Sequence, residues 1–419
     1  MLKHSSFLFK NNKSQKLLHF ILTLTTIFFA DAVLAFWLPT YLQNTFSSAL
    51  IMGIIISFSS VVGIITDFFF PQIFPEISEK KTLKFTLFFQ SIFVGLLILS
   101  LQFPYWWVFI LAVAAWGIYF EFLAFSSKIF VSDHVAKQAY TNVWAEISLG
   151  KSFAYLTGPI VASILIANNN FSVLMASFFA ILTAQLLLSF FKDKKVEIET
   201  KITPENEEIN LEPKMELNHW WTLTKKIWPI ILLSYTITTI DATFWTSGTV
   251  LTEKIIGDFP LAIFLMPLYM APMILAQIIL IKSGINQEKE RKATILLLIN
   301  SILLFIFGQS PVGINLLIMV FFIGLNTALS FPIVESLYSE LEERMGIHKK
   351  HLISLSSSTY SLAYILAPIS AGLLSQLFGE QKTFSYLGIF VCLISLFILI
   401  FNKKKIIIPQ QEINTWTEK

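Results

Sequence analysis

The chain has 419 residues, of which 55% are hydrophobic and only 14% are charged. An ordinary soluble domain carries about 25% charged residues, so this composition argues against a soluble globular protein. The net charge is +3, from 30 basic and 27 acidic residues, and this balance gives no reason to expect a nucleic-acid partner. With Cys392 as its single cysteine, the chain can form no internal disulfide and no cysteine-based metal cluster.

Apolar stretches of about 20 residues recur along the chain between short clusters of charge, and stretches of this length predict membrane-spanning helices. Helices are expected rather than barrel strands because the runs are continuously apolar instead of alternating. We predict an all-α integral membrane protein with twelve spans, at residues 17–42, 48–69, 84–102, 105–127, 139–166, 171–191, 228–251, 259–281, 294–309, 312–334, 352–378 and 384–402.

The basic residues predict the orientation of these spans. If the N-terminus is cytoplasmic, 27 of the 30 lysines and arginines fall on the cytoplasmic side, and the outer loops keep only Lys254 and Lys382. We therefore expect a protein of the cell membrane with both termini in the cytoplasm. The start of the chain also resembles a signal peptide that ends at Ala30-Asp31-Ala32. A retained span is favoured, because the apolar run continues through Trp37.

The chain divides into two halves of similar design. We predict a bundle of six helices at 1–191, a polar cytoplasmic linker at 192–227, a second bundle at 228–402 and a cytoplasmic tail at 403–419. Residues 152–165 align without gaps with residues 361–374, and seven of the fourteen positions are identical. Asp31-Ala32 similarly matches Asp241-Ala242 at almost the same offset. This internal repeat indicates two parallel, pseudo-symmetric bundles.

Twelve spans in a 6+6 arrangement, Gly158-Pro159 in the fifth span, and Gly63 and Asp67 at the inner end of the second resemble the major facilitator superfamily. The resemblance covers essentially the whole chain. It implies secondary transport by alternating access, with a central cavity between the halves lined by the first, fourth, seventh and tenth spans. The family's motif between the second and third spans is incomplete here, since Phe68 stands where a basic residue is usual. This departure puts the gating contacts of that motif in doubt.

Small residues repeat every four positions along the fifth and eleventh spans, which allows close helix packing in lipid. Gly158 belongs to the stripe of the fifth span. Pro159 and Pro368 lie at matching positions next to the stripes, and each proline removes one backbone hydrogen bond and should bend its helix. The stripes could serve static packing or form sliding seams between the halves. We include all three residues, with Gly63 and Asp67, as candidate gating or packing positions.

Two carboxylates lie near the middle of their spans, where a charge costs about 2.5 to 3.5 kcal/mol. Asp31 is at the centre of the first span and Asp241 at the centre of the seventh. They are expected to line the transport cavity and bind protons or substrate; the alternative is hydrogen bonding between helices. Thr238 and Trp245 share the helical face of Asp241 and are candidate substrate contacts.

Two further polar groups are candidate binding residues. Glu121 in the fourth span is either a coupling or substrate carboxylate or an internal partner of Lys128 or Lys151. Asn326 in the tenth span is able to line the cavity or to join helices. His348 and His351 lie in a lysine-rich loop without a third ligand, so no metal or other cofactor is expected. The sequence also lacks a phosphate-binding glycine loop, so coupling is expected to use an ion gradient.

The sequence therefore predicts a proton-coupled secondary transporter for a small molecule, monomeric and not an enzyme. Its acidic interior favours export of cationic or amphipathic compounds. Uptake of a neutral solute such as a sugar is an alternative. A membrane sensor that binds a ligand without transporting it is an alternative of another class.

Overall fold

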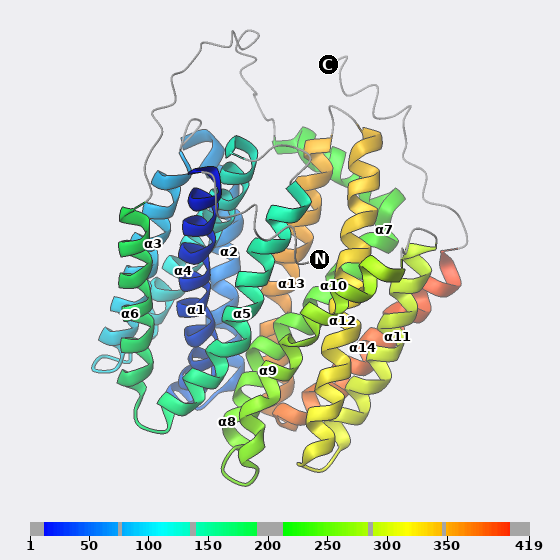
Figure 1. Cartoon of the computed structure of the whole chain (residues 1–419). Coiled ribbons are helices and arrows are strands. Elements are labelled where there is room, and N and C mark those ends of the chain that lie inside the picture. Colours follow the sequence, from blue (N-terminus) through cyan, green and yellow to red (C-terminus); the bar gives the residue numbers. More distant parts are fainter. Residues whose placement is uncertain are drawn as a thin grey trace.

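A computed structural model describes residues 12–73, 78–134, 140–190, 213–283, 288–345 and 349–402, and every regular element in these ranges is helical. The helices run roughly alongside one another (Figure 1). We refer to residues 12–190 as the N-terminal half and to residues 213–402 as the C-terminal half. The N-terminal half contains α1 (Asn12–Phe46), α2 (Ala49–Ile73), α3 (Glu79–Ser100), α4 (Trp106–His134), α5 (Tyr140–Ile166) and α6 (Asn170–Ser189).

The C-terminal half is less regular at its start. Helix α7 (Pro213–Thr243) has a kink at Ile227, where φ is −111° and ψ is 16°, two residues before Pro229. The kink follows from the missing N–H and the bulk of the proline ring. The elements of this half are α7 (Pro213–Thr243), the π-helix η3 (Phe244–Gly248), α8 (Thr249–Ile255), the 3₁₀-helix η4 (Pro260–Phe264), α9 (Leu265–Met270), α10 (Pro272–Ser283), α11 (Lys289–Gln309), α12 (Ile314–Met345), α13 (Lys349–Phe378) and α14 (Glu380–Phe401).

Eleven helical stretches in the described residues are long and apolar enough to cross a membrane. The expected eighth span is instead divided among η4, α9 and α10. Its apolar stretch, Pro260–Ala276, is shorter than each of the eleven candidate spans. Pro260, Pro267 and Pro272 lie at or near these divisions, as expected for residues that interrupt helical hydrogen bonding. Twelve spans in two bundles of six therefore remain a prediction.

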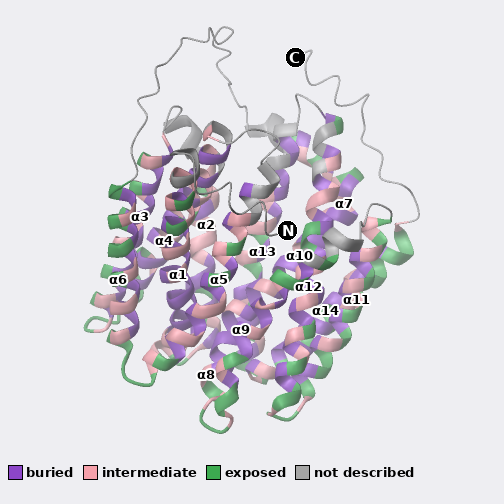
Figure 2. Cartoon of the chain, viewed as in Figure 1, coloured by how far each residue is buried: buried purple, intermediate pink, exposed green. Residues whose placement is uncertain are grey.

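Exposed positions follow the sides of the molecule, as Figure 2 shows for α6, α11 and α14, and many of these positions hold large apolar side chains. Phe179 of α6, Ile302 of α11 and Leu393 of α14 are each at least 60% exposed. Soluble monomers rarely expose so much apolar surface, whereas helices that face lipid tails are expected to expose it. Together with the eleven candidate spans, this surface indicates an integral membrane protein.

The two halves approach each other closely along α2 and α13. A Cβ atom added to Gly53 of α2 would lie 2.0 Å from the carbonyl oxygen of Pro368 in α13. A Cβ atom added to Gly372 of α13 would lie 2.2 Å from the carbonyl oxygen of Ala49 in α2. Ser57 of α2 also donates a hydrogen bond of 2.6 Å to the carbonyl oxygen of Ile365. Glycine therefore permits backbone contact between the halves, as small residues do elsewhere in membrane proteins.

Further contacts between the halves lie at one end of the molecule. We call the end at which α6 ends and α7 begins the linker end, and the opposite end, where α8 lies in Figure 1, the distal end. At the distal end, Gln43 of α1 donates a hydrogen bond of 2.6 Å to Glu380 of α14. Ser163 of α5 donates one of 3.0 Å to Glu253 of α8. The distal end is thus joined by polar contacts as well as by packing.

Candidate functional site

Asp31 lies in α1 and is enclosed by hydrogen-bond donors from two other helices. Its carboxylate accepts a bond of 2.9 Å from the Trp116 indole and a short one from the Tyr119 hydroxyl, both on α4. Trp116 and Tyr119 are three residues apart and therefore share a helical face. The Tyr155 hydroxyl of α5 donates to the other carboxylate oxygen. Asp31 is 1% exposed, so it faces the interior of the protein rather than lipid.

Asp241 lies near the end of α7 and receives two tyrosine hydroxyls. Tyr269 of α9 donates a hydrogen bond of 3.1 Å to Oδ1, and Tyr364 of α13 donates one of 2.5 Å to Oδ2. Asp241 is partly exposed, unlike Asp31. Each mid-span carboxylate thus has hydrogen-bond partners from more than one helix, which lowers the cost of placing it at this depth.

The two carboxylate sites share one repeated element. Tyr155 and Tyr364 occupy equivalent positions in the repeat of residues 152–165 and 361–374. Tyr155 joins α5 to Asp31 of α1, and Tyr364 joins α13 to Asp241 of α7. The internal repeat therefore extends from the sequence to a pair of equivalent contacts, each between an aspartate and a tyrosine. We call these two contacts the Asp–Tyr pairs.

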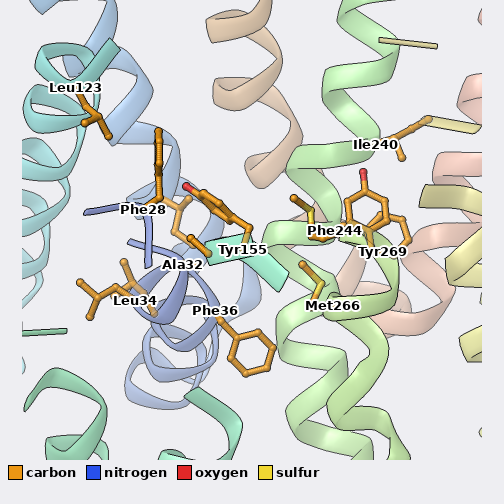
Figure 3. Close-up of a cluster of buried hydrophobic side chains, with 14 of the residues drawn as sticks. Phe28, Ala32, Leu34, Phe36, Leu123, Tyr155, Ile240, Phe244, Met266 and Tyr269 are labelled. Atoms are coloured by element: carbon orange, nitrogen blue, oxygen red, sulfur yellow. The ribbon is translucent and has the colours of Figure 1, made fainter. Parts of the chain in front are cut away.

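The Asp–Tyr pairs lie near each other across the two halves. The ring of Trp245 contacts the ring of Tyr155 edge to face, with centroids 5.2 Å apart. Figure 3 shows Tyr155 and Phe28 on one side and Phe244 and Tyr269 on the other. Lys151, one turn before Tyr155 on α5, interacts electrostatically with both Asp31 and Asp241. The centre of the molecule thus combines two carboxylates, one ammonium group and several aromatic rings.

A π-helical turn begins three residues after Asp241 and contains two aromatic residues. It comprises Phe244–Gly248 and contains Trp245. Phe244 stacks on Tyr269, with centroids 4.2 Å apart, and this contact joins η3 to α9. Single π turns within α-helices often occur at functional sites. The turn therefore lies close to Asp241 along the chain and carries the Trp245 ring, which contacts Tyr155.

Three other candidate binding residues have partners elsewhere. Thr238 bonds to the Ser234 carbonyl of its own helix, and the amide of Asn326 bonds to the Phe322 carbonyl of its own helix. Glu121 of α4 lies against Gly63 of α2, where a Cβ atom would be 3.0 Å from the Glu121 carboxylate. None of these contacts brings the three residues into the Asp–Tyr pairs, and their roles in binding stay predictions.

The candidate gating and packing residues lie at helix contacts. Gly158 of α5 faces α1, where an added Cβ atom would lie 2.6 Å from the Cβ atom of Ala32. Pro159 and Pro368 lie inside the helices α5 and α13. Asp67 lies near the linker end of α2 and has an interaction partner. These positions suit packing, and whether they move during a transport cycle stays a prediction.

Solved structures of several transporters share one fold with more than nine-tenths of this chain. The nucleoside transporter NupG superposes with a TM-score of 0.68 at 12% identity, over 91% of this chain and 99% of that chain. A D-xylose–proton symporter gives a TM-score of 0.66 at 15% identity, over 92% and 97%. A POT family transporter in complex with a thioalcohol-conjugated peptide gives 0.70 at 14%, over 93% and 96%. The chain has the major facilitator superfamily fold. By sequence, no protein family and no curated protein matches it.

Within the major facilitator fold, sequence reasoning found the two aspartates and missed the residues that contact them. Tyr155 and Tyr364 are identical positions of the repeat, and this was the available signal. Tyr119 and Tyr269 carry no such signal, because their contacts depend on how α4 and α9 are rotated. Among the described residues, no three histidine, cysteine or acidic side chains are grouped so as to hold a metal ion.

Proposed function

We propose that this chain is a secondary active transporter that moves a small molecule across the cell membrane by alternating access, with protons as the coupling ion. The observation that carries this proposal is the pair of equivalent Asp–Tyr contacts in the two halves of a major facilitator fold. A carboxylate at mid-membrane depth is costly when charged, so proton binding and release there have a large effect on which conformation is stable. The solved neighbours are transporters, which supports transport rather than enzyme catalysis.

The proposed cycle moves the N-terminal and C-terminal halves against each other, as two six-helix bundles joined by a linker. The hydrogen bonds between Gln43 and Glu380 and between Ser163 and Glu253 support a state in which the distal end is closed. Opening that end requires these contacts to break. The positions of the basic residues support a cytoplasmic linker end, which would make the distal end the outer one.

The proposal is tested by reconstitution into liposomes with a pH-sensitive dye inside. Compound classes are added outside, and the expected result is movement of protons driven by a solute gradient. Asp31→Asn and Asp241→Asn should each abolish the coupled proton signal. Asp258→Asn, a carboxylate in the exposed loop between α8 and η4, is the matched control and should behave as the wild type. Full activity and unchanged pH dependence in both site variants would show that these aspartates do not couple transport.

The other interpretations from the sequence remain open to the same assay. Export of a cationic or amphipathic compound predicts that such compounds drive protons in the opposite direction to their own movement. Uptake of a neutral solute predicts the same direction for both. A sensor predicts ligand binding without any solute or proton movement, and this result would overturn the proposed transport function.

A further inference from the structure

Lys151 is the charged group of the central site with unused hydrogen-bonding capacity. Its Nζ lies 5.6 Å from the centre of the Phe28 ring and 5.7 Å from that of Tyr155. Rings of this kind attract a cation but satisfy its three N–H donors poorly. Among the described residues, its ammonium makes no hydrogen bond or direct ion pair with a side chain. Lys151 thus needs water or a ligand oxygen at mid-membrane depth.

The two carboxylates nearby, by contrast, already accept hydrogen bonds from protein side chains. Asp31 accepts hydrogen bonds from three side chains and is 1% exposed. Asp241 accepts two, from Tyr269 and Tyr364. Lys151 interacts with both carboxylates only at a distance. A cationic substrate would have to compete with the five donors that these carboxylates already bind, whereas an anionic group could approach the ammonium without competing with a protein acceptor.

We propose, on the basis of the transport function inferred above, that Lys151 binds the carboxylate or phosphate group of the substrate and that one such anion is carried with one proton. The substrate is a small organic anion, or a zwitterion that presents its anionic end to Lys151. The proton comes from water and binds a carboxylate oxygen of Asp31 or Asp241. It leaves to water on the other side of the membrane, together with the anion.

The ratio of one proton to one anion follows from charge balance in a site of low dielectric constant. The ammonium contributes one positive charge and the two aspartates contribute up to two negative charges. The empty site is neutral when one aspartate is protonated. With a monovalent anion bound, it is neutral when both are protonated. Since an unbalanced buried charge is strongly unfavourable, binding the anion requires one additional proton. A monovalent anion and its proton therefore cross together without net charge, whereas a zwitterion, which has no net charge, would bind without an additional proton.

The same charge balance also permits exchange of a cation for a proton. With a monovalent cation bound, the site is neutral when both aspartates are ionised, so the cation would replace the single proton of the empty site. The hydrogen bonds distinguish these two modes. Five donors occupy the two carboxylates, and no acceptor side chain in the described residues occupies the Lys151 ammonium. This asymmetry favours an anion.

Ligand-dependent melting of the purified full chain in nanodiscs tests the proposal. The probes are lactate, glycerol 3-phosphate and alanine, compared with glucose as the neutral probe and tetramethylammonium as the cationic probe. At least one anionic or zwitterionic probe should raise the melting temperature of the wild type by a few degrees. Lys151→Met should weaken that binding by about ten- to a hundredfold, because a charged hydrogen bond is lost. Lys151→Arg should retain most of it.

Two results would overturn the proposal. One is stabilisation only by glucose or tetramethylammonium; the other is that no anionic or zwitterionic probe stabilises the wild type more than Lys151→Met. The melting temperature without probe shows whether each variant is folded. If Lys151→Met does not fold, the comparison of probe binding between the wild type and Lys151→Arg remains as the test. Alanine separates a zwitterionic substrate from the simple anions.

Transport of the stabilising probe into proteoliposomes separates this inference from the proposed function. An anion that binds through Lys151 but does not cross the membrane would refute transport and leave the binding site intact. Proton-coupled movement of a cation, unaffected by Lys151→Met, would refute the role of Lys151 and leave the transport function intact. Anion uptake should be accelerated by an inward proton gradient and unchanged by a membrane potential, because the loaded site is neutral.

Discussion

Tyr155 and Tyr364 lie 209 positions apart in the sequence, and each donates a hydrogen bond to the mid-span aspartate of its own half. Each bond joins a helix that contacts the other half to one that carries a mid-span carboxylate, since α5 contacts α9 and α13 contacts α2. A change in the protonation of either aspartate therefore acts directly on a helix at the interface. In the proposed cycle, this arrangement would connect the charge of the site to the relative position of the halves.

Removal of either tyrosine hydroxyl should destabilise the protein. Tyr155→Phe leaves a fully buried carboxylate with one donor fewer, at an expected cost of about 1 to 3 kcal/mol. Tyr364→Phe should cost less, because Asp241 is partly exposed and water can replace the lost donor. Thermal unfolding in nanodiscs measures both effects, and proton movement in liposomes shows whether coupling is lost.

Tyr105→Phe is the control for these variants, because Tyr105 is 56% exposed and stacks on Trp107 away from the carboxylates. It should unfold at the wild-type temperature. Equal stability of Tyr155→Phe and Tyr105→Phe would contradict a structural role for the bond to Asp31.

Gly53→Ala should disrupt the contact between α2 and α13. The added methyl group would lie 2.0 Å from the carbonyl oxygen of Pro368, so one helix has to shift. Such overpacking costs about 1 to 3 kcal/mol. Gly95→Ala in α3 is the matched control, because nothing lies within 4 Å of its added Cβ atom. It should stabilise the protein by about 0.5 to 1 kcal/mol, since alanine favours a helix over glycine. Comparison of the two unfolding temperatures decides the prediction.

Lys254→Met should weaken closure of the distal end. Lys254 of α8 and Gln43 of α1 both donate to Glu380, each at 2.6 Å, and Glu380 is 8% exposed. Without the lysine, a largely buried carboxylate loses its counter-charge, so separation of the halves becomes easier. Cysteines are introduced at the exposed distal positions Asn168 and Asp258, after Cys392→Ser has removed the native cysteine. Spin labels attached to these two cysteines report the distance between the halves.

The distance distribution of Lys254→Met should contain a larger population of long distances than that of the wild type. Lys382→Met removes the same charge from an exposed position at the start of α14 and should leave the distribution unchanged. A matching distribution in all three proteins would show that the Lys254–Glu380 pair does not hold this end closed.

The orientation proposed from the basic residues is testable by reporter fusions. Alkaline phosphatase, whose disulfides form only outside the cytoplasm, should be active when fused after Asp258 and inactive when fused after Lys419. Green fluorescent protein at the same two positions should give the reverse pattern. Phosphatase activity at the C-terminus would place the linker end outside and invert the direction of the proposed cycle.

Helix length and apolarity were sufficient to predict an all-helical membrane protein, whereas the twelve spans in two bundles that the internal repeat indicates stay a prediction. The sequence also located Asp31 and Asp241, because a carboxylate in the middle of an apolar run is visible without a structure. The stretch near 259–281 was less predictable. Its apolar composition predicts one span, but Pro260, Pro267 and Pro272 divide it into short helices.

The partners of the aspartates depend on the rotation and tilt of whole helices, which hydropathy does not encode. Tyr119 and Tyr269 are ordinary aromatic residues of apolar runs until α4 and α9 turn them toward a carboxylate. Lys151 was expected to pair with Glu121 as one alternative. It instead lies over Phe28 and Tyr155 and within electrostatic range of both aspartates, while Glu121 lies against Gly63.

The turn at Phe244–Gly248 holds one residue more than an ordinary helical turn would. If this turn rewound as a regular α-helix, the residues after it would rotate by about 100° around the helix axis, since each α-helical residue accounts for that angle. Glu253 and Lys254 would then no longer point toward Ser163 and Glu380. The winding of five residues beside Asp241 therefore determines which side chains α8 offers to the rest of the protein.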